Sequence, residues 1–142
     1  MRALLDVNVL IALHDPTHVQ HVTASRWFTA NAKSGWASCP LTQNGCVRIM
    51  SQPAYPNAQP MSALLDMLRQ STSSPIHQFW SDDVTLLDAK RFRQAHIHGH
   101  RQITDLYLLG LAVKNGGRLV TFDIRIPLTA VHGATSSHLV SL

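Results

Sequence analysis

The sequence contains no glutamate, and only 14% of its 142 residues are charged. All eight acidic residues are aspartates, at positions 6, 15, 66, 82, 83, 88, 105 and 123. The low charge and the 45% hydrophobic content exclude a highly charged disordered chain and predict a folded domain with its own core. A chain with so few carboxylates is expected to place several of them for a purpose.

Cysteines and long apolar runs are also scarce. Cys39 and Cys46 are the only cysteines, and their spacing matches no metal or redox motif, which indicates two free thiols in a reducing compartment. Asp6 and Asn8 interrupt the apolar N-terminal stretch MRALLDVNVLIALHD, and no cleavage site follows it. We therefore expect no signal peptide, no membrane span and a cytoplasmic protein.

The charge that is present is mostly positive. Twelve lysines and arginines outnumber the eight acids and give a net charge of +4, to which nine histidines can add. A basic surface suits a polyanionic partner such as nucleic acid. The low charged fraction also indicates that a protein partner covers some apolar surface.

The hydrophobic pattern predicts strands that alternate with helices in one domain, residues 1–142. We expect strands at 3–6, 36–39, 77–80, 118–122 and 138–142, and helices at 7–14, 18–31, 41–50, 62–70, 88–95 and 104–114. The proline-bearing segment 52–60 is predicted to be a loop, and Asp82-Asp83 a turn. This alternation indicates an α/β fold whose mainly parallel sheet is covered on both faces.

Three aspartates fall where such a fold binds its ligands. Asp6 closes the first predicted strand, Asp123 closes the strand at 118–122, and Asp105 opens the helix at 104–114. Ligands of an open α/β sheet bind beyond the carboxyl ends of the strands, so we expect these carboxylates in one cleft. Because they repel each other, they call for a divalent cation, and oxygen ligands favour Mg²⁺ or Mn²⁺. Metal ions held this way cleave phosphodiesters.

The motifs around these aspartates resemble those of PIN-domain nucleases: LLDVNVLIAL, QITDLYLLGLA and LVTFD. The stretches WASCPLTQNGCVRIMS, FWSDDVTLLD and GHRQITD are similar to the VapC toxins of VapBC toxin–antitoxin systems. The resemblance covers nearly the whole chain. It implies a three-layer α/β/α fold, Mg²⁺-dependent endoribonuclease activity, a homodimer and neutralisation by a VapB-type antitoxin.

The resemblance also implies roles for single residues. The three aspartates are the expected metal ligands and catalytic residues, with Asn8, Thr121 and Thr104 in support. The family usually has a fourth acid where this chain has Gln43. A glutamine can offer a carbonyl oxygen or orient a water, but it removes one negative charge, so its place among the ligands is doubtful.

Basic residues supply the candidate RNA contacts: Arg48, His98, His100 and Arg101. A solvated basic face is the competing interpretation. A zinc site at His96, His98 and His100 is less favoured, because no cysteine or fourth ligand lies near them in the sequence. His18 is expected on a helix surface or at a dimer edge.

Two other functions stay open at this point. A haloacid-dehalogenase-type phosphatase also has an aspartate after its first strand, but it needs a second acid where this chain has Asn8. It also needs paired acids after a late strand, whereas Ile124 and Arg125 follow Asp123. A PIN domain without nuclease activity would act as an RNA- or protein-binding module, and Gln43 is its main support.

Overall fold

In the computed structural model, which describes all residues from 1 to 142, five strands form one sheet of order β3-β2-β1-β4-β5. The strands are β1 (Ala3–Leu5), β2 (Trp36–Ser38), β3 (His77–Phe79), β4 (Arg118–Thr121) and β5 (Leu139–Ser141). Every neighbouring pair is parallel. All five expected strands are present, and each is one or two residues shorter than expected.

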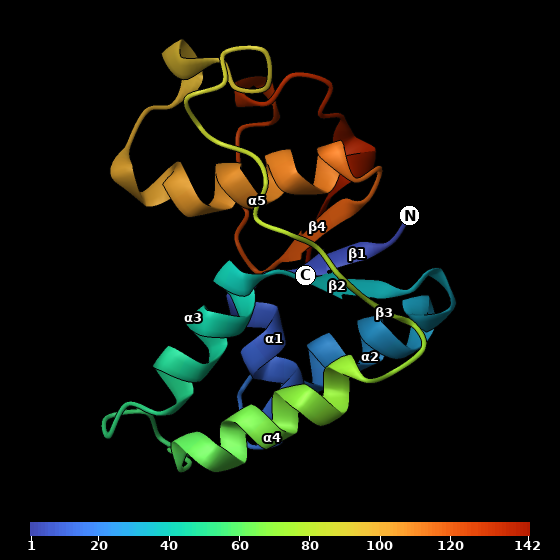
Figure 1. Cartoon of the computed structure of the whole chain (residues 1–142), viewed down its shortest axis with the longest axis vertical. Helices are drawn as coiled ribbons and strands as arrows, with labels where there is room; N and C mark the ends of the chain where they lie inside the picture. Colours follow the sequence, from blue (N-terminus) through green and yellow to red (C-terminus); the bar gives the residue numbers. More distant parts are fainter.

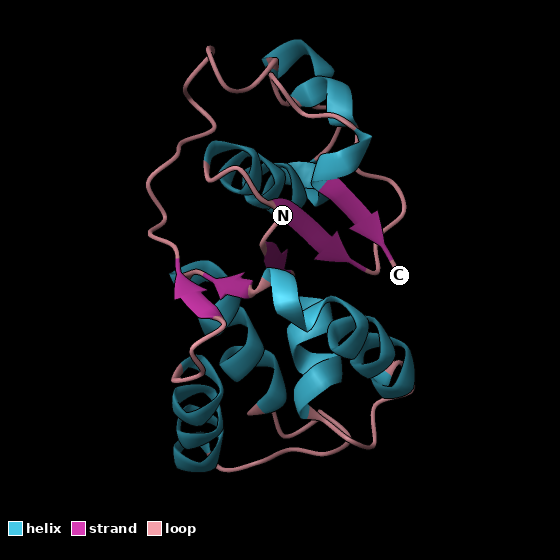
Figure 2. Ribbon diagram, turned by 90° about the vertical axis from the view of Figure 1, so that its right-hand side faces the viewer, coloured by secondary structure: helices cyan, strands magenta, loops and turns pink.

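Helices cover both faces of the sheet (Figure 1). One face carries α1 (Val7–His14), α2 (His21–Asn31), α3 (Pro40–Met50) and α4 (Met61–Thr72), and the other carries α5 (Ile103–Lys114). Figure 2 shows the strands between the two helical layers. The fold is therefore the expected three-layer α/β/α arrangement. None of the helices has the length and apolar character that crossing a bilayer requires.

Each face of the sheet has its own hydrophobic core. Leu5 of β1 packs in the core beneath α1 and α3, and its neighbour Leu4 packs in the core beneath α5. Successive side chains of a strand point to opposite faces, so a strand that is buried on both faces must be apolar throughout. The Ala3–Leu5 strand is fully buried and meets this requirement.

The segment from 81 to 102 differs from its prediction. The helix expected at 88–95 is absent, and only the short 3₁₀ turns Gln94–His96 and His100–Gln102 form there. Asp88 accepts the hydrogen bond that an N-cap accepts, from the backbone N–H of Lys90 at 2.9 Å. The backbone around Phe92 instead pairs with Val131 in an antiparallel bridge, which replaces the helix. The segment is long and mostly irregular, and it crosses one face of the molecule in Figure 1.

The turn predicted at Asp82-Asp83 does not form: both residues are exposed in an irregular stretch, and their side chains make tertiary contacts. Asp82 accepts a hydrogen bond from the backbone N–H of Leu41 at 3.0 Å, and Asp83 forms an ion pair with Lys114. The two acids therefore fasten an extended segment to α3 and to α5.

The positions at which α1 and α5 begin determine which aspartate side chains are used to cap a helix. Asp6 is the N-cap of α1, as expected, and accepts a hydrogen bond from the backbone N–H of Val7 at 2.7 Å. The expected cap of α5 at Thr104 or Asp105 is wrong: Gln102 is the N-cap, and Asp105 lies in the first turn. Its carboxylate is therefore not used for capping.

Candidate metal centre

The carboxyl edge of the sheet brings Asp6, Asp105 and Asp123 together. Strands β1 and β4 are neighbours with Leu5 opposite Val120, so the aspartates that follow them emerge at the same edge. Asp105 reaches this edge from the first turn of α5. One carboxylate oxygen from each aspartate lies within 4.8 Å of the others.

Asn8 and Thr121 hold two of these three carboxylates by hydrogen bonds. The Thr121 hydroxyl donates to Oδ2 of Asp6 at 2.6 Å and accepts from the backbone N–H of Asp123 at 3.0 Å. The Asn8 amide nitrogen lies 3.3 Å from both the Thr121 hydroxyl and Oδ2 of Asp123. Asp6 and Asp123 are therefore oriented by neutral donors, whereas Asp105 stands without such support.

The surroundings raise the pKa of two of these acids. Burial, together with the nearby charges of Asp6 and Asp123, raises the pKa of Asp105 to about 6. Burial also raises the pKa of Asp6, which is only 5% exposed, against the hydrogen bonds from Thr121 and Val7 that lower it. A cluster of this kind is stabilised either by protons or by a bound cation.

The donor set fits Mg²⁺ or Mn²⁺. Two oxygens on one such ion are at most about 4.2 Å apart, because each lies about 2.1 Å from the metal. The separation of up to 4.8 Å seen here needs only a small closure of the side chains to meet that limit. The cluster contains carboxylates and neither thiol nor imidazole, which favours these hard cations over Zn²⁺.

A cavity of about 290 Å³ opens beside the three acids and follows α1. Val7, Asn8 and Ile11 of α1 line it together with the three aspartates, and the opposite wall is formed by His18, Ile49 and Tyr55. Sequence-based prediction missed this wall. The Asp15-Pro16 dipeptide, a turn signal, could have shown that α2 does not reach back to His18, and α2 in fact begins at His21.

Gln43 is not among the residues that line the cavity beside the three aspartates. Its amide nitrogen donates to the Ser38 hydroxyl at 2.9 Å, and that hydroxyl also lies 2.9 Å from Nε2 of His77. Gln43 instead lines a second cavity of about 490 Å³ between α3 and α4, which it shares with Arg48. Only the amide nitrogen of Gln43 is used in this way, and Gln43 does not line the cavity beside the three acids.

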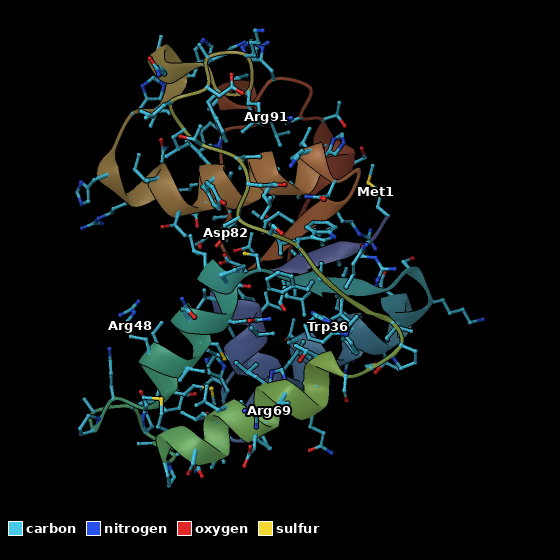
Figure 3. All side chains as sticks on the ribbon, in the orientation of Figure 1. Met1, Trp36, Arg48, Arg69, Asp82 and Arg91 are labelled. Atoms are coloured by element: carbon cyan, nitrogen blue, oxygen red, sulfur yellow. The ribbon has the colours of Figure 1, made fainter.

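The remaining predicted residues lie outside the acidic cavity. Thr104, His98, His100 and Arg101 are exposed around the start of α5. Arg48 is exposed on α3 and projects from the lower half of the molecule in Figure 3. His96, His98 and His100 do not converge on a common point as metal ligands would, so the less favoured zinc site does not form.

Both the sequence and the fold of this chain are similar to those of known proteins. Residues 3–131 match the PIN domain family. The chain is 51% identical to the ribonuclease VapC44 of Mycobacterium tuberculosis over the full length of both proteins. It is 44% identical to the ribonuclease VapC39 of the same species over 134 residues, which cover 94% of this chain and 96% of that protein.

Two solved structures share the fold at low sequence identity. The Mycobacterium tuberculosis VapC20, described as a toxin that cleaves the Sarcin-Ricin loop, superposes with a TM-score of 0.58 at 11% identity. VapBC2 from Rickettsia felis, bound to a DNA fragment from its promoter, gives a TM-score of 0.57 at 12% identity. Each match covers 87% of this chain and 89% of the other, and at these identities it supports the fold alone.

Proposed function

This chain belongs to the PIN-domain family, and on that premise we propose that it is a metal-dependent endoribonuclease of the VapC type. Its full-length relatives are named ribonucleases. The observation that carries the proposal is the convergence of three carboxylate oxygens, from three separate elements, within 4.8 Å. Because the chain matches the PIN-domain family, we do not retain the haloacid-dehalogenase-type phosphatase as an alternative function. We take the whole chain, residues 1–142, as one PIN domain.

In this proposal Asp6, Asp105 and Asp123 are the catalytic residues and hold Mg²⁺ or Mn²⁺. A divalent ion supplies an activated water and stabilises the leaving oxygen of a phosphodiester. Asn8 and Thr121 keep two of the carboxylates oriented through the hydrogen bonds described above. The cavity beside α1 receives the RNA strand, whose phosphates repel the three aspartates unless the cation is present.

Partners and location are part of the same proposal. The relatives named VapC, and the VapBC2 neighbour, support a VapB-type antitoxin as the protein partner. We propose a cytoplasmic homodimer without membrane association, in which Arg48, His98, His100 and Arg101 contact RNA phosphates. Light scattering should report about twice the chain mass of 15.7 kDa, and the chain mass alone would contradict the dimer.

The experiment compares RNA cleavage by the parent, Asp105→Asn and Asp66→Asn with Mg²⁺ and with EDTA. Asp105 accepts no hydrogen bond, so its amide variant removes a metal ligand and leaves the fold intact. Asp66 is the matched control, since it is an exposed acid on α4 that pairs only with Arg69. We expect a loss of about 100-fold or more for Asp105→Asn, the size seen when an electrostatic contact to the reacting group is removed.

Ribosomal and transfer RNA serve as substrates, because unpaired bases in structured RNA are the ones that a protein can read. Cleavage that persists in EDTA, or an Asp105→Asn variant as active as the parent, would overturn the metal-dependent nuclease. A parent that binds Mn²⁺ and RNA without cutting would be the binding module that the sequence left open.

A further inference from the structure

We propose that His18 and Tyr55 form a subsite for the nucleotide next to the scissile phosphate, and that the buried carboxylate of Asp15 builds this subsite. The proposal rests on the ribonuclease function proposed above and deepens it. It assigns the wall of the acidic cavity that the three aspartates do not form. The expected ligand is one nucleotide of a single RNA strand.

The first support is the shape of the cavity. The three aspartates lie at the N-terminal end of α1, and the cavity continues along this helix to Ile11, where it meets His18, Ile49 and Tyr55. Asp6 and Ile11 are five residues apart, which corresponds to about 7.5 Å along a helix. Neighbouring nucleotides of an extended strand are separated by a similar length. A strand with its phosphate at the acids therefore places the next nucleotide against this wall.

The second support is the way in which Asp15 fixes the wall. Asp15 is only 3% exposed. Its Oδ1 accepts hydrogen bonds from the backbone N–H of Thr17 at 3.0 Å and from the Thr17 hydroxyl at 2.8 Å. The same oxygen accepts from the Asn57 amide at 3.0 Å, and Oδ2 accepts from the Tyr55 hydroxyl. One carboxylate thus joins the turn that carries His18 to the loop that carries Tyr55.

The third support is the orientation of the His18 ring. The backbone N–H of His18 donates to the Asp15 carbonyl at 3.0 Å, and the backbone N–H of Gln20 donates to Nδ1 of His18 at 3.0 Å. Because Nδ1 accepts, the neutral ring carries its proton on Nε2. This N–H is a donor without a partner in the protein, at the edge of a cavity whose other polar groups are mainly carboxylates. A phosphate or base oxygen is the acceptor that it suits.

The fourth support is the chemistry of Tyr55. Its hydroxyl is occupied by Asp15, so the half-buried ring offers the cavity an apolar aromatic surface beside Ile49. Metal binding needs no such surface. Proteins that bind single-stranded RNA commonly stack a base on an aromatic side chain, and a cavity of this size holds one nucleotide rather than a duplex.

The test measures binding of an eight-nucleotide single-stranded RNA that contains 2-aminopurine, whose fluorescence falls on stacking. All proteins carry Asp105→Asn, so that the RNA is not cut, and affinities are compared only within this background. We expect Tyr55→Leu to weaken binding about tenfold and to abolish the stacking signal, since one stacked base is worth about 1–3 kcal/mol. Tyr55→Phe keeps the ring but loses the hydrogen bond to Asp15, so it should bind more weakly than the parent, more tightly than Tyr55→Leu, and keep a stacking signal. His18→Ala should weaken binding about fivefold, the effect of one lost hydrogen bond.

Phe79→Leu is the matched control, because Phe79 is an aromatic residue on β3 that is 54% exposed and lies outside the cavity. Equal affinities for Tyr55→Leu and Phe79→Leu would overturn the subsite; if the Asp105→Asn protein binds no RNA, the KM values described below decide. If Tyr55→Leu does not fold, His18→Ala decides: parent-like affinity overturns the proposal.

Kinetics with the otherwise unchanged enzyme separate this proposal from the proposed function. Tyr55→Leu should raise KM and leave kcat nearly unchanged, since the contact is made equally before and during the reaction. If the parent cleaves RNA and neither substitution alters KM, the subsite fails alone. If the parent does not cleave but RNA binding depends on Tyr55 and His18, the nuclease fails and the binding subsite stands.

Discussion

Two buried aspartates lie at the two ends of α1, and their surroundings shift their pKa values in opposite directions. Asp6, the N-cap, is 5% exposed, and Asp15, the C-cap, is 3% exposed. Burial raises the pKa of Asp6, and the charge of Asp123 adds to the rise. Burial would raise the pKa of Asp15 as well, but the hydrogen bonds from Tyr55, Asn57 and Thr17 outweigh it and hold that pKa well below its usual range.

The helix dipole alone would give the reverse order. It stabilises an anion at the N-terminus, where Asp6 lies, and destabilises one at the C-terminus, where Asp15 lies. The partners of each carboxylate therefore outweigh the dipole. A buried carboxylate surrounded by hydrogen-bond donors has its charge stabilised already and contributes to the stability of the fold. A buried carboxylate that faces other carboxylates requires a proton or a cation.

The largest expected effect is the loss of stability on removal of Asp15. Asp15→Ala leaves the donors of Thr17, Tyr55 and Asn57 unpaired, and hydrogen bonds to a charged group contribute about 1.5–3 kcal/mol each. We expect the free energy of unfolding, measured in urea, to fall by about 3 kcal/mol or more. The exposed Asp66→Ala should change it by less than about 0.5 kcal/mol. A loss equal to that of this control would remove the structural role of Asp15.

The next effect concerns the metal. Mn²⁺ at about 100 times its dissociation constant should raise the free energy of unfolding of the parent by about 2.7 kcal/mol, because the ion binds only the native cluster. Asp105→Asn should lose most of this gain, while Asp15→Asn should keep it. Thermal melts with and without Mn²⁺ measure the difference. A gain that survives in Asp105→Asn would place the ion elsewhere.

A smaller effect is the pH dependence of this gain. The pKa of Asp105 is raised to about 6 in the folded protein, so its proton stabilises the metal-free fold at low pH, and this stabilisation is lost as the pH rises through about 6. Below that pH, Mn²⁺ must displace the proton. The rise in Tm on adding Mn²⁺ should therefore be smaller at pH 5.0 than at pH 7.5, in the parent and in Asp15→Asn alike. Equal rises at both pH values would contradict the proton competition.

The three aspartates could be predicted from the sequence because each depends on local signals. Asp6 and Asp123 follow short apolar strands, and Asp105 lies at the start of a strongly apolar helix. A parallel sheet then brings these ends together by its topology alone. The alternation of strands and helices likewise decides the three layers, since each strand must be covered on both faces.

The parts that could not be predicted depend on contacts between residues far apart in the sequence. Tyr55 reaches the cavity wall because its hydroxyl binds Asp15, 40 residues earlier. Gln43 binds the hydroxyl of Ser38 at the end of β2 and lines the cavity between α3 and α4. The segment from 81 to 102 follows its contacts with α3 and α5, which no local periodicity encodes.

The smallest expected effect lies in the last turn of α1, at His14, one residue before Asp15. Nδ1 of His14 lies 2.8 Å from the carbonyl oxygen of Leu10, which can only accept, so Nδ1 carries the proton and Nε2 accepts from the Ser71 hydroxyl at 2.9 Å. Burial lowers the pKa of His14, against the hydrogen bond to Leu10, which raises it. As the pH falls, the unfolded chain therefore protonates His14 at a higher pH than the folded protein does. Stability is lost as the pH falls below about 6.5.

Between pH 7.5 and 5.5 this loss cannot exceed about 1.4 kcal/mol. The reason is that pH 5.5 lies one unit below the pKa of a histidine in the unfolded chain, and one pKa unit corresponds to about 1.4 kcal/mol. The parent and His14→Gln should be unfolded in urea at both pH values, so that the contributions of His77 and of the acidic cluster cancel in the difference. We expect His14→Gln to be less stable than the parent at pH 7.5, and the gap to shrink at pH 5.5. A gap of the same size at both pH values would mean that His14 accepts a proton in the folded protein as readily as in the unfolded chain. Burial of the ring would then not favour the neutral form of His14 over the charged one.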